Sequence, residues 1–231
     1  MGIRSVSDTF LPYFEKYLTD APADIQVTTS MDDIAYERDR TAREDYLEGR
    51  PPRRFPDQYL ETLAIYRKIA VEMLQRDTLL FHGSAISVDG EGFLFTAKSG
   101  TGKSTHTRLW REMFGDRAVM VNDDKPLLKI EDDRVMVCGT PWNGKHSLGS
   151  NIMVPLKGLC ILTRAEENHI RRITGRQAMP MLLQQSFRPP DPVAVSKLLV
   201  LLEKMVQRVG IFELGCNMDP EAAAVAYQGM K

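Results

Sequence analysis

The stretch FTAKSGTGKSTHTRLW, from Phe95 to Trp110, passes from apolar residues typical of a strand, through small residues, to a pattern typical of a helix. Its centre, from Ala97 to Ser104, matches the phosphate-loop pattern G-x-x-x-x-G-K-[ST] at every position except the first, where alanine replaces glycine. The pattern requires a strand before it and a helix after it, and both are predicted here. The stretch therefore predicts an α/β nucleotide-binding domain.

The residues of this loop suit a polyphosphate ligand. Gly100 and Gly102 allow the backbone conformations in which successive N–H groups face an anion. Lys103 can reach the outer phosphates, and the Ser104 hydroxyl can ligate Mg²⁺. We therefore expect ATP and Mg²⁺ as cofactors, although a glycine-rich turn with a chance lysine is the alternative. The residues expected to contact the nucleotide are Ser99, Gly100, Thr101, Gly102, Lys103, Ser104 and Thr105.

A pair of aspartates, Asp123 and Asp124, ends the next predicted strand, VMVNDD. Ligands of α/β sheets gather at the carboxyl ends of strands, so both carboxylates are expected to face the terminal phosphate. One would hold Mg²⁺, with Asp124 and Ser104 as candidate metal ligands, and the other would accept a proton from an attacking hydroxyl. The sequence leaves open which aspartate has which role. The alternative is a solvated turn, because Asn-Asp-Asp is favourable turn chemistry.

Two more residues are candidates for this site. His82 ends a short apolar run one strand upstream of the loop. We consider a role in the site and a purely structural role equally for this residue. Lys145 lies in the long segment GTPWNGKHSLGSN, typical of a lid or binding loop, and could neutralise transition-state charge. The catalytic candidates are thus Asp123, Asp124, His82, Lys103 and Lys145. The arginines expected on the surface or in ion pairs are Arg108, Arg111, Arg164, Arg171 and Arg172.

Composition excludes several classes of protein. The chain has 231 residues, 43% of them apolar, and a formal net charge of -1, which indicates a globular protein without the basic surface that nucleic acid or an anionic membrane would need. Its three widely spaced cysteines argue against a disulfide framework. No segment has membrane-spanning length, and the first residues lack the apolar core of a signal peptide, so we expect a cytoplasmic location. The sequence is compatible with a homo-oligomer.

Hairpins and crossovers alternate along the chain, which predicts an α/β fold on a mixed sheet. The most polar segment, residues 31–58, is expected to be irregular. We predict a single domain over residues 1–231, with a polar N-terminal arm (about 1–56) and a phosphate-loop core (about 57–231). The main expected elements are a helix from Asp57, a hairpin at VDGEGF, a second hairpin turning at Asp132, a strand LKGLCILTRA with NHIRRIT beside it, two helices, a strand GIFELGC and a last helix capped by Asp219.

Together, HGSAISVDGEGFLFTAKSGTGKST and VMVNDD resemble the HPr kinase/phosphorylase-like group of the phosphoenolpyruvate-carboxykinase-like fold. The resemblance covers the chain from Leu80 to Asp124. It implies that Lys103 and Ser104 bind phosphates and Mg²⁺, that the two aspartates share the base and metal roles, and that His82 lies against the reacting phosphate. The second signature of HPr kinases is missing downstream of the aspartates, which implies an acceptor other than HPr.

The leading hypothesis is an ATP- and Mg²⁺-dependent kinase, a phosphotransferase that moves the γ-phosphate to a serine-type hydroxyl of a small molecule, peptide or protein. A non-catalytic nucleotide-binding regulatory protein is one alternative. A reversible kinase/phosphorylase, which would also release pyrophosphate from a phosphoserine and inorganic phosphate, is the other. The sequence leaves open the acceptor and whether the donor is ATP, GTP or pyrophosphate.

Overall fold

The computed structural model describes residues 1–8, 11–47, 49–144 and 146–231. The chain groups into two compact units, Met1–Glu72 and Met73–Lys231. Whether these make one domain, as the sequence predicts, stays a prediction. The first unit contains β1 (Gly2–Arg4), α1 (Leu11–Phe14), η1 (Glu15–Tyr17), β2 (Gln26–Thr28), α2 (Met31–Leu47) and α3 (Asp57–Leu74), whose last residues belong to the second unit.

A buried carboxylate organises the first unit. β1 and β2 pair in parallel, and the Glu61 carboxylate of α3 binds the chain after each of them. Its Oε1 accepts hydrogen bonds from the Val6 amide and the Thr29 hydroxyl, both at 2.6 Å, and its Oε2 accepts one from the Ser7 amide at 3.1 Å. A buried carboxylate is stable only when donors satisfy it, so Glu61 fixes both segments.

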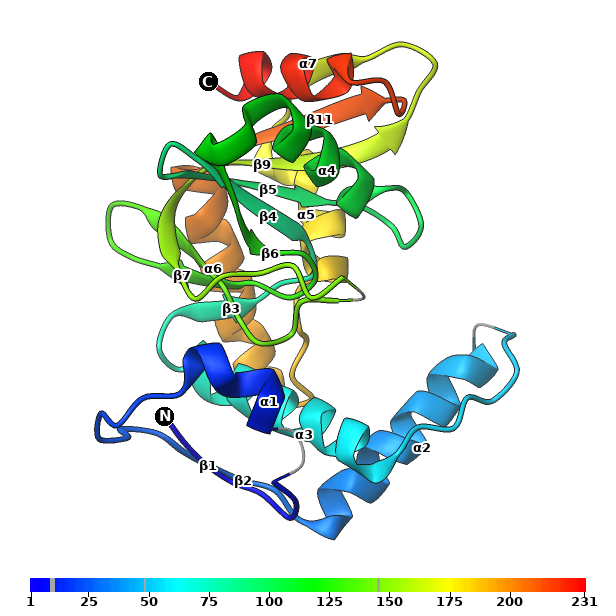
Figure 1. Cartoon of the computed structure of the whole chain (residues 1–231), viewed down its shortest axis with the longest axis vertical. Helices are drawn as coiled ribbons and strands as arrows, with labels where there is room; N and C mark the ends of the chain where they lie inside the picture. Colours follow the sequence, from blue (N-terminus) through cyan, green and yellow to red (C-terminus); the bar gives the residue numbers. More distant parts are fainter. Residues whose placement is uncertain (9–10, 48, 145) are drawn as a thin grey trace. The chain divides into compact units, whose positions relative to one another are not determined.

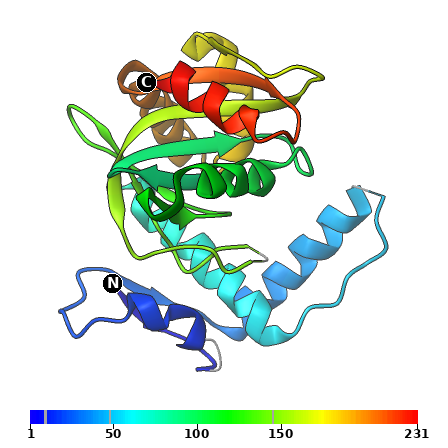
Figure 2. The ribbon, with the colours of Figure 1, turned by 45° about the horizontal axis from the view of Figure 1, so that its top comes forward.

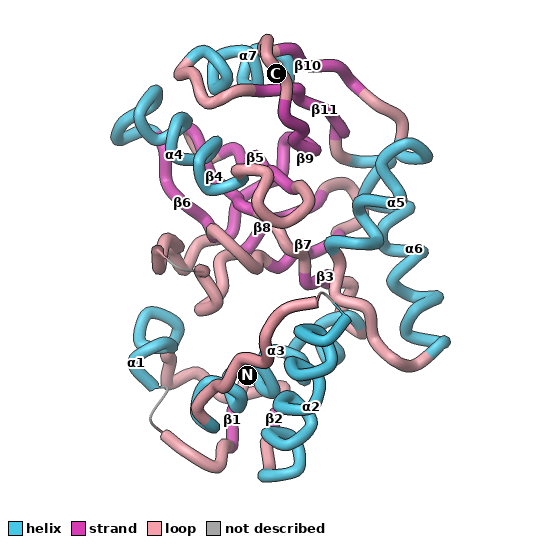
Figure 3. Tube along the Cα trace, turned by 90° about the vertical axis from the view of Figure 1, so that its right-hand side faces the viewer, coloured by secondary structure: helices cyan, strands magenta, loops and turns pink. Residues whose placement is uncertain are grey.

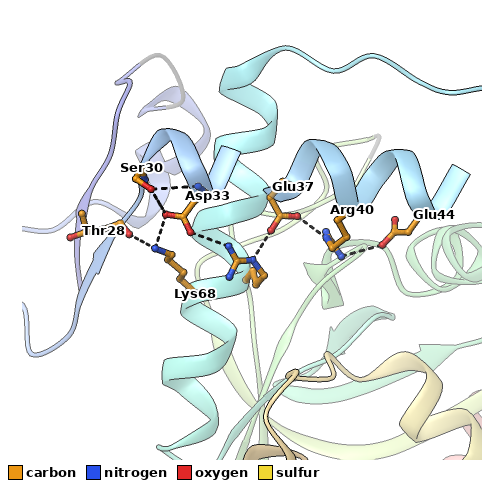
Figure 4. Close-up of polar contacts among 8 residues, drawn as sticks. Thr28, Ser30, Asp33, Glu37, Arg40, Glu44 and Lys68 are labelled. Carbon is orange, nitrogen blue, oxygen red and sulfur yellow. Dashed lines mark hydrogen bonds and ion pairs between the residues drawn. The ribbon is translucent and has the colours of Figure 1, made fainter. Parts of the chain in front are cut away.

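The charge-rich segment after β2 is largely a helix, so the prediction that residues 31–58 are irregular was wrong over Met31–Leu47. Charges spaced three and four residues apart pair along α2, where Arg40 contacts Glu37 at 2.7 Å and Glu44 at 3.2 Å (Figure 4). Such pairs stabilise a helix that has only a weak apolar stripe.

Helix α3 supplies the other partners of these charges. Arg67 contacts Glu37 at 2.6 Å and Asp33 at 3.1 Å. Lys68 contacts Asp33 at 2.7 Å (Figure 4). The Glu37 side chain is fully buried, so its two arginines are required to offset the loss of hydration. The sequence pattern did not predict α2, because the arginine that pairs with its buried Glu37 lies on another helix, thirty residues later in the chain.

The second unit is a mixed α/β fold, which confirms the predicted fold class at that level. Its elements are β3 (Thr78–Leu80), β4 (Ser84–Val88), β5 (Glu91–Thr96), α4 (Lys103–Phe114), η2 (Gly115–Arg117), β6 (Ala118–Asn122), β7 (Leu127–Ile130), β8 (Val135–Cys138), β9 (Met153–Arg164), β10 (His169–Arg172), α5 (Gly175–Gln185), α6 (Pro192–Arg208), β11 (Gly210–Cys216) and α7 (Glu221–Met230). None of the described helices of the chain is long and apolar enough to cross a membrane.

The long strand β9 joins two parts of the sheet. Its first residues pair with β8, which continues through β7 to β3, and all of these pairs are antiparallel. Its remaining residues lie between β5 and β11 and are parallel to both. The order on this side is β10-β11-β9-β5-β4-β6. The predicted hairpins are confirmed as β4–β5, which turns at Asp89 and Gly90 with positive φ at both, and β7–β8.

Helices cover both faces of this sheet, which explains why its central strands are apolar at successive positions. In β9, Leu159 and Ile161 face one cluster, while Cys160 and Leu162 face the other. The first cluster packs under α5 and α6, which lie together in Figure 3. The second packs under α4 and α7, which lie side by side in Figures 1 and 2.

Two details differ from the sequence-based expectations. β10 pairs with β11 rather than with β9, because β11 enters the sheet between them. Asp219 does not cap the last helix with its side chain, which instead accepts a hydrogen bond from Asn217 at 3.0 Å. The first difference comes from strands that are distant in the sequence. The second comes from a hydrogen bond within the turn before the helix.

Trp110 fixes α4 to the sheet. Its fully buried ring contacts Phe93, Phe95 and Phe114 at centroid distances of 4.9, 5.1 and 5.5 Å. Its Nε1 donates a hydrogen bond to His106 Nε2 at 3.1 Å, and burial lowers the pKa of His106 to about 4. His106 is therefore neutral in the folded protein at neutral pH.

Acid should destabilise the second unit through His106. Because its pKa is about 4 in the folded state and about 6.5 when unfolded, the unfolded chain takes up the proton first as the pH falls below 6.5. We expect the free energy of unfolding to lose about 3 kcal/mol between pH 6.5 and pH 4 from this group. In His106→Gln, which keeps an acceptor for Trp110, denaturant titrations should show a shallower loss than in the wild type. The exposed control His169→Gln should match the wild type, and equal slopes in all three would contradict the assignment.

Candidate active site

Strand directions bring the predicted site residues to one edge of the sheet. β5 and β6 are both antiparallel to β4, and β9 is parallel to β5. The carboxyl ends of β5, β6 and β9, at Thr96, Asn122 and Arg164, therefore lie along the same edge. The segments that carry the glycine-rich loop and the paired aspartates both begin there.

The glycine-rich loop connects β5 directly to α4. Gly100 and Gly102 have φ values of 76° and 117°, in the left-handed region that glycine adopts most easily. The Lys98 carbonyl accepts hydrogen bonds from the Thr101 amide at 3.3 Å and the Thr101 hydroxyl at 2.9 Å. α4 begins at Lys103, so the positive end of this helix lies at the end of the loop. The loop therefore has the surroundings that favour an anion.

Asp123 lies in a buried network of hydroxyl groups. Its side chain is 7% exposed, and its Oδ1 accepts a hydrogen bond from Ser84 Oγ at 2.6 Å. Ser84 Oγ also lies 2.9 Å from Thr107 Oγ1, which in turn lies 3.3 Å from the carbonyl oxygens of Lys103 and Ser104. Thr107 lies on α4, one turn after Lys103. The network therefore connects β6, β4 and α4.

Asp124 has different surroundings. Its side chain is partly exposed, and its Oδ1 lies 3.4 Å from His82 Nε2. The backbone holds the pair in place, because Gly83 N donates to the Asp124 carbonyl at 3.0 Å and His82 N donates to the Gln185 carbonyl at 2.7 Å. Asp124 is thus the aspartate of the pair that solvent and a ligand can reach.

Electrostatic effects connect Lys103 to both aspartates and His82 to Asp124. Burial lowers the pKa of Lys103, while Asp124 and Asp123 oppose this shift. Burial also lowers the pKa of His82, and Lys103 lowers it further while Asp124 raises it. These interactions require proximity. The structure therefore brings Lys103, His82, Asp123 and Asp124 together.

Asn122 shapes the turn that carries the aspartates. Its side-chain oxygen accepts hydrogen bonds from the amides of Asp124 at 2.9 Å and Lys125 at 2.6 Å, and its Nδ2 donates to Asn143 Oδ1 at 2.8 Å. Asn143 belongs to the segment from Gly139 to Asn151 that the sequence indicates as a binding loop. Asn122 thereby attaches this segment to the end of β6.

The same segment lies close to Asp124. A Cβ on Gly144, which has a φ of 69°, would lie 3.2 Å from Asp124 Cβ, so the backbone passes directly beside this carboxylate. Lys145 follows immediately and lies outside the described residues, so its role stays a prediction.

The remaining nucleotide candidates lie along the loop and the start of α4. Ser99, Gly100 and Ser104 are exposed, and Thr101, Gly102 and Thr105 are half-buried. Hydroxyl and carboxylate oxygens of the kind that Mg²⁺ prefers are present at Ser104 and Asp124. No group of three or more metal-ligating His, Cys, Asp or Glu side chains occurs in the described part of the chain. Mg²⁺ sites at phosphates need only one or two carboxylates, so these residues fit the ion.

Sequence reasoning missed several residues that contact this site: Ser84, Thr107, Gln185 and Arg164. Thr107 follows Lys103 by one helical turn, a spacing that could have indicated it. Gln185 and Arg164 are distant in sequence and gave no signal. The arginine prediction is confirmed for Arg108, which pairs with Glu112, and for Arg171, which pairs with Glu213. Arg164 is exposed, as predicted for a surface residue, and it donates a hydrogen bond to the carbonyl of Gly100.

Comparisons with known proteins add little to this description. No family model matches the chain, and no curated protein matches it. Among solved structures, the chain is similar to the Hpr(Ser) kinase/phosphatase from Coxiella burnetii, with 14% sequence identity and a TM-score of 0.39. That match covers 64% of this chain and 94% of the other. At this level of similarity the match carries no argument about function.

Loss of the Ser84 hydroxyl should lower the free energy of unfolding, because the buried Asp123 carboxylate loses a hydrogen-bond donor. Ser84→Ala removes a donor from a buried carboxylate, so we expect the free energy of unfolding to fall by about 1–3 kcal/mol. The matched control is Ser87→Ala, a buried serine of the same strand for which the described structure shows no side-chain hydrogen bond. Chemical denaturation at pH 7 measures both. Equal losses in the two variants would show that the Ser84–Asp123 contact is not needed.

Proposed function

We propose that the chain is an ATP- and Mg²⁺-dependent kinase that transfers the γ-phosphate to a serine-type hydroxyl of a small molecule, peptide or protein. One observation carries the proposal. Lys103 belongs to a phosphate-loop motif between a strand and a helix, and it interacts electrostatically with both aspartates of the neighbouring strand end. A polyphosphate bound at this loop would have two carboxylates beside its terminal group.

The loop and α4 account for nucleotide binding in this proposal. Lys103 binds the outer phosphates, while loop amides and the start of α4 supply partial positive charge. Ser104 and Asp124 would hold Mg²⁺, which neutralises the charge on the phosphates. Ser104 is exposed and Asp124 partly exposed, which suits a hydrated ion that arrives with the nucleotide.

The reaction is a direct, in-line transfer. The acceptor oxygen forms a bond to the γ-phosphorus while the bond from that phosphorus to the bridging oxygen of ADP breaks. The hydroxyl proton passes to a carboxylate of the aspartate pair, which shares the base and metal roles. Burial lowers the pKa of His82, which favours its neutral form beside Asp124. Catalysis comes from positioning and electrostatics.

The motif order also supports the choice of chemistry. The resemblance of residues 80–124 to the HPr kinase/phosphorylase-like group favours a hydroxyl acceptor. The segment from Gly139 to Asn151 lies against the aspartates and replaces the missing second signature of HPr kinases, so we assign it to acceptor binding. Lys145 within it is the proposed cation that would neutralise transition-state charge.

Replacing Lys103 tests the proposal. The protein is incubated with ATP labelled in its γ-phosphate, Mg²⁺ and a pool of metabolites and peptides, and labelled products are separated and identified. Lys103→Ala should abolish transfer and weaken ATP binding by about tenfold or more, because a charge-assisted contact to phosphate is lost. Lys157→Ala, which breaks an exposed pair with Glu91, is the control and should keep both. Tight ATP binding by the wild type without transfer or hydrolysis would instead favour a regulatory protein.

The two aspartate variants separate chemistry from binding. Asp123→Asn and Asp124→Asn keep the side-chain shape but remove the charge, so turnover should fall by about a hundredfold or more while the ATP affinity changes far less. Single-turnover transfer and calorimetric binding of Mg²⁺-ATP measure the two effects. Equal losses in turnover and affinity would mean that the carboxylate only anchors the metal.

A further inference from the structure

An arginine from a neighbouring strand contacts the tip of the glycine-rich loop. Arg164 ends β9, and one of its terminal guanidinium nitrogens donates a hydrogen bond to the Gly100 carbonyl at 2.7 Å. The sequence predicts Arg164 as an ordinary surface or ion-paired residue. In the structure, its guanidinium group contacts this main-chain carbonyl.

The backbone of Arg164 is firmly placed for this contact. β9 pairs with β5 up to Thr96 and Ile161, and with β11 up to Arg164 and Cys216. The next amide, of Ala165, donates to the Cys216 carbonyl at 3.1 Å. Arg164 therefore projects from an ordered strand end, about 10 Å beyond the level where β5 ends and the loop begins.

Inside the loop, the Lys98 carbonyl accepts hydrogen bonds from the Thr101 amide and hydroxyl, and Arg164 adds a contact from outside the loop. A Cβ on Gly100 would have no atom within 4 Å, so the space on that side of the residue is open. Gly100 has a φ of 76°, and because glycine has no Cβ it adopts other backbone angles as easily. The Arg164 contact therefore helps to select one orientation of the peptide that joins Gly100 to Thr101.

Geometry links that orientation to anion binding. In a trans peptide the C=O and N–H groups point in opposite directions. Arg164 holds the Gly100 carbonyl on one side, and the Thr101 amide points to the other, where it meets the Lys98 carbonyl at 3.3 Å. That contact is long for an N–H···O hydrogen bond, so a phosphate oxygen can replace it at small cost.

We propose that Arg164 is a positioning residue for polyphosphate binding, which holds the Gly100 carbonyl outward so that the Thr101 amide faces the phosphates. This rests on the proposed function. Arg164 acts through the loop and not through the nucleoside. Its effect is therefore the same for every ligand that places phosphates in the loop.

Calorimetry with two probes tests this role. In Arg164→Ala, Mg²⁺-ATP and Mg²⁺-pyrophosphate should both bind about threefold to tenfold more weakly, which corresponds to one lost hydrogen bond. Arg164→Lys retains a donor and should lie between the wild type and Arg164→Ala. The control Arg171→Ala, which breaks an exposed pair with Glu213 on the neighbouring strands, should bind both probes like the wild type.

Hydrogen exchange of the free protein gives a second readout. The Thr101 amide should exchange faster in Arg164→Ala than in the wild type, while the melting temperature stays unchanged. A merely structural arginine would shift the melting temperature instead.

The outcomes are distinct. Unchanged affinity for both probes in Arg164→Ala overturns this inference alone. Loss of affinity for ATP but not for pyrophosphate also overturns it, because Arg164 would then contact the nucleoside. A wild type that binds neither probe overturns the proposed function together with this inference.

Discussion

The direction of three strands is the constraint on which the candidate site depends. β5 and β6 flank β4 and both run antiparallel to it, so the loop after β5 and the turn after β6 emerge at the same edge. α4 crosses between them on one face of the sheet, and Trp110 fixes it there. If either strand ran the other way, the lysine and the carboxylates would lie at opposite edges.

Two adjacent aspartates have different physical states because alternate side chains at a strand end face different surroundings. Asp123 is buried and accepts a hydrogen bond from Ser84, whose hydroxyl group also contacts that of Thr107. Asp124 stays partly exposed beside His82. Burial of a carboxylate is costly unless donors compensate for lost water, so the hydroxyl pair is what permits Asp123 to remain inside. Asn122 completes the arrangement by binding the amides of the turn.

Most of the elements around the site could be predicted from local patterns. The strand, loop and helix from Glu91 to Phe114, the helix that starts at Asp57 and both hairpins are confirmed. The helix α2 was missed, because its buried Glu37 is satisfied by Arg67 from another helix. The partner of β10 was also missed, because the strand that pairs with it comes some forty residues later. No local pattern in the sequence predicted the contact of Ser84 with Asp123 or that of Arg164 with Gly100.

By itself, the sequence determined the phosphate-loop motif, the aspartate pair that follows one strand later and the mixed order of strands and helices. These are local features, because glycine conformations, turn chemistry and apolar periodicity act over a few residues. Tertiary structure alone decided that Lys103 interacts with both aspartates and His82 with Asp124, that Asp123 is buried while Asp124 is accessible, and that Arg164 contacts the loop. These contacts join residues far apart in the chain, and their distances follow from strand order and direction rather than from any local pattern.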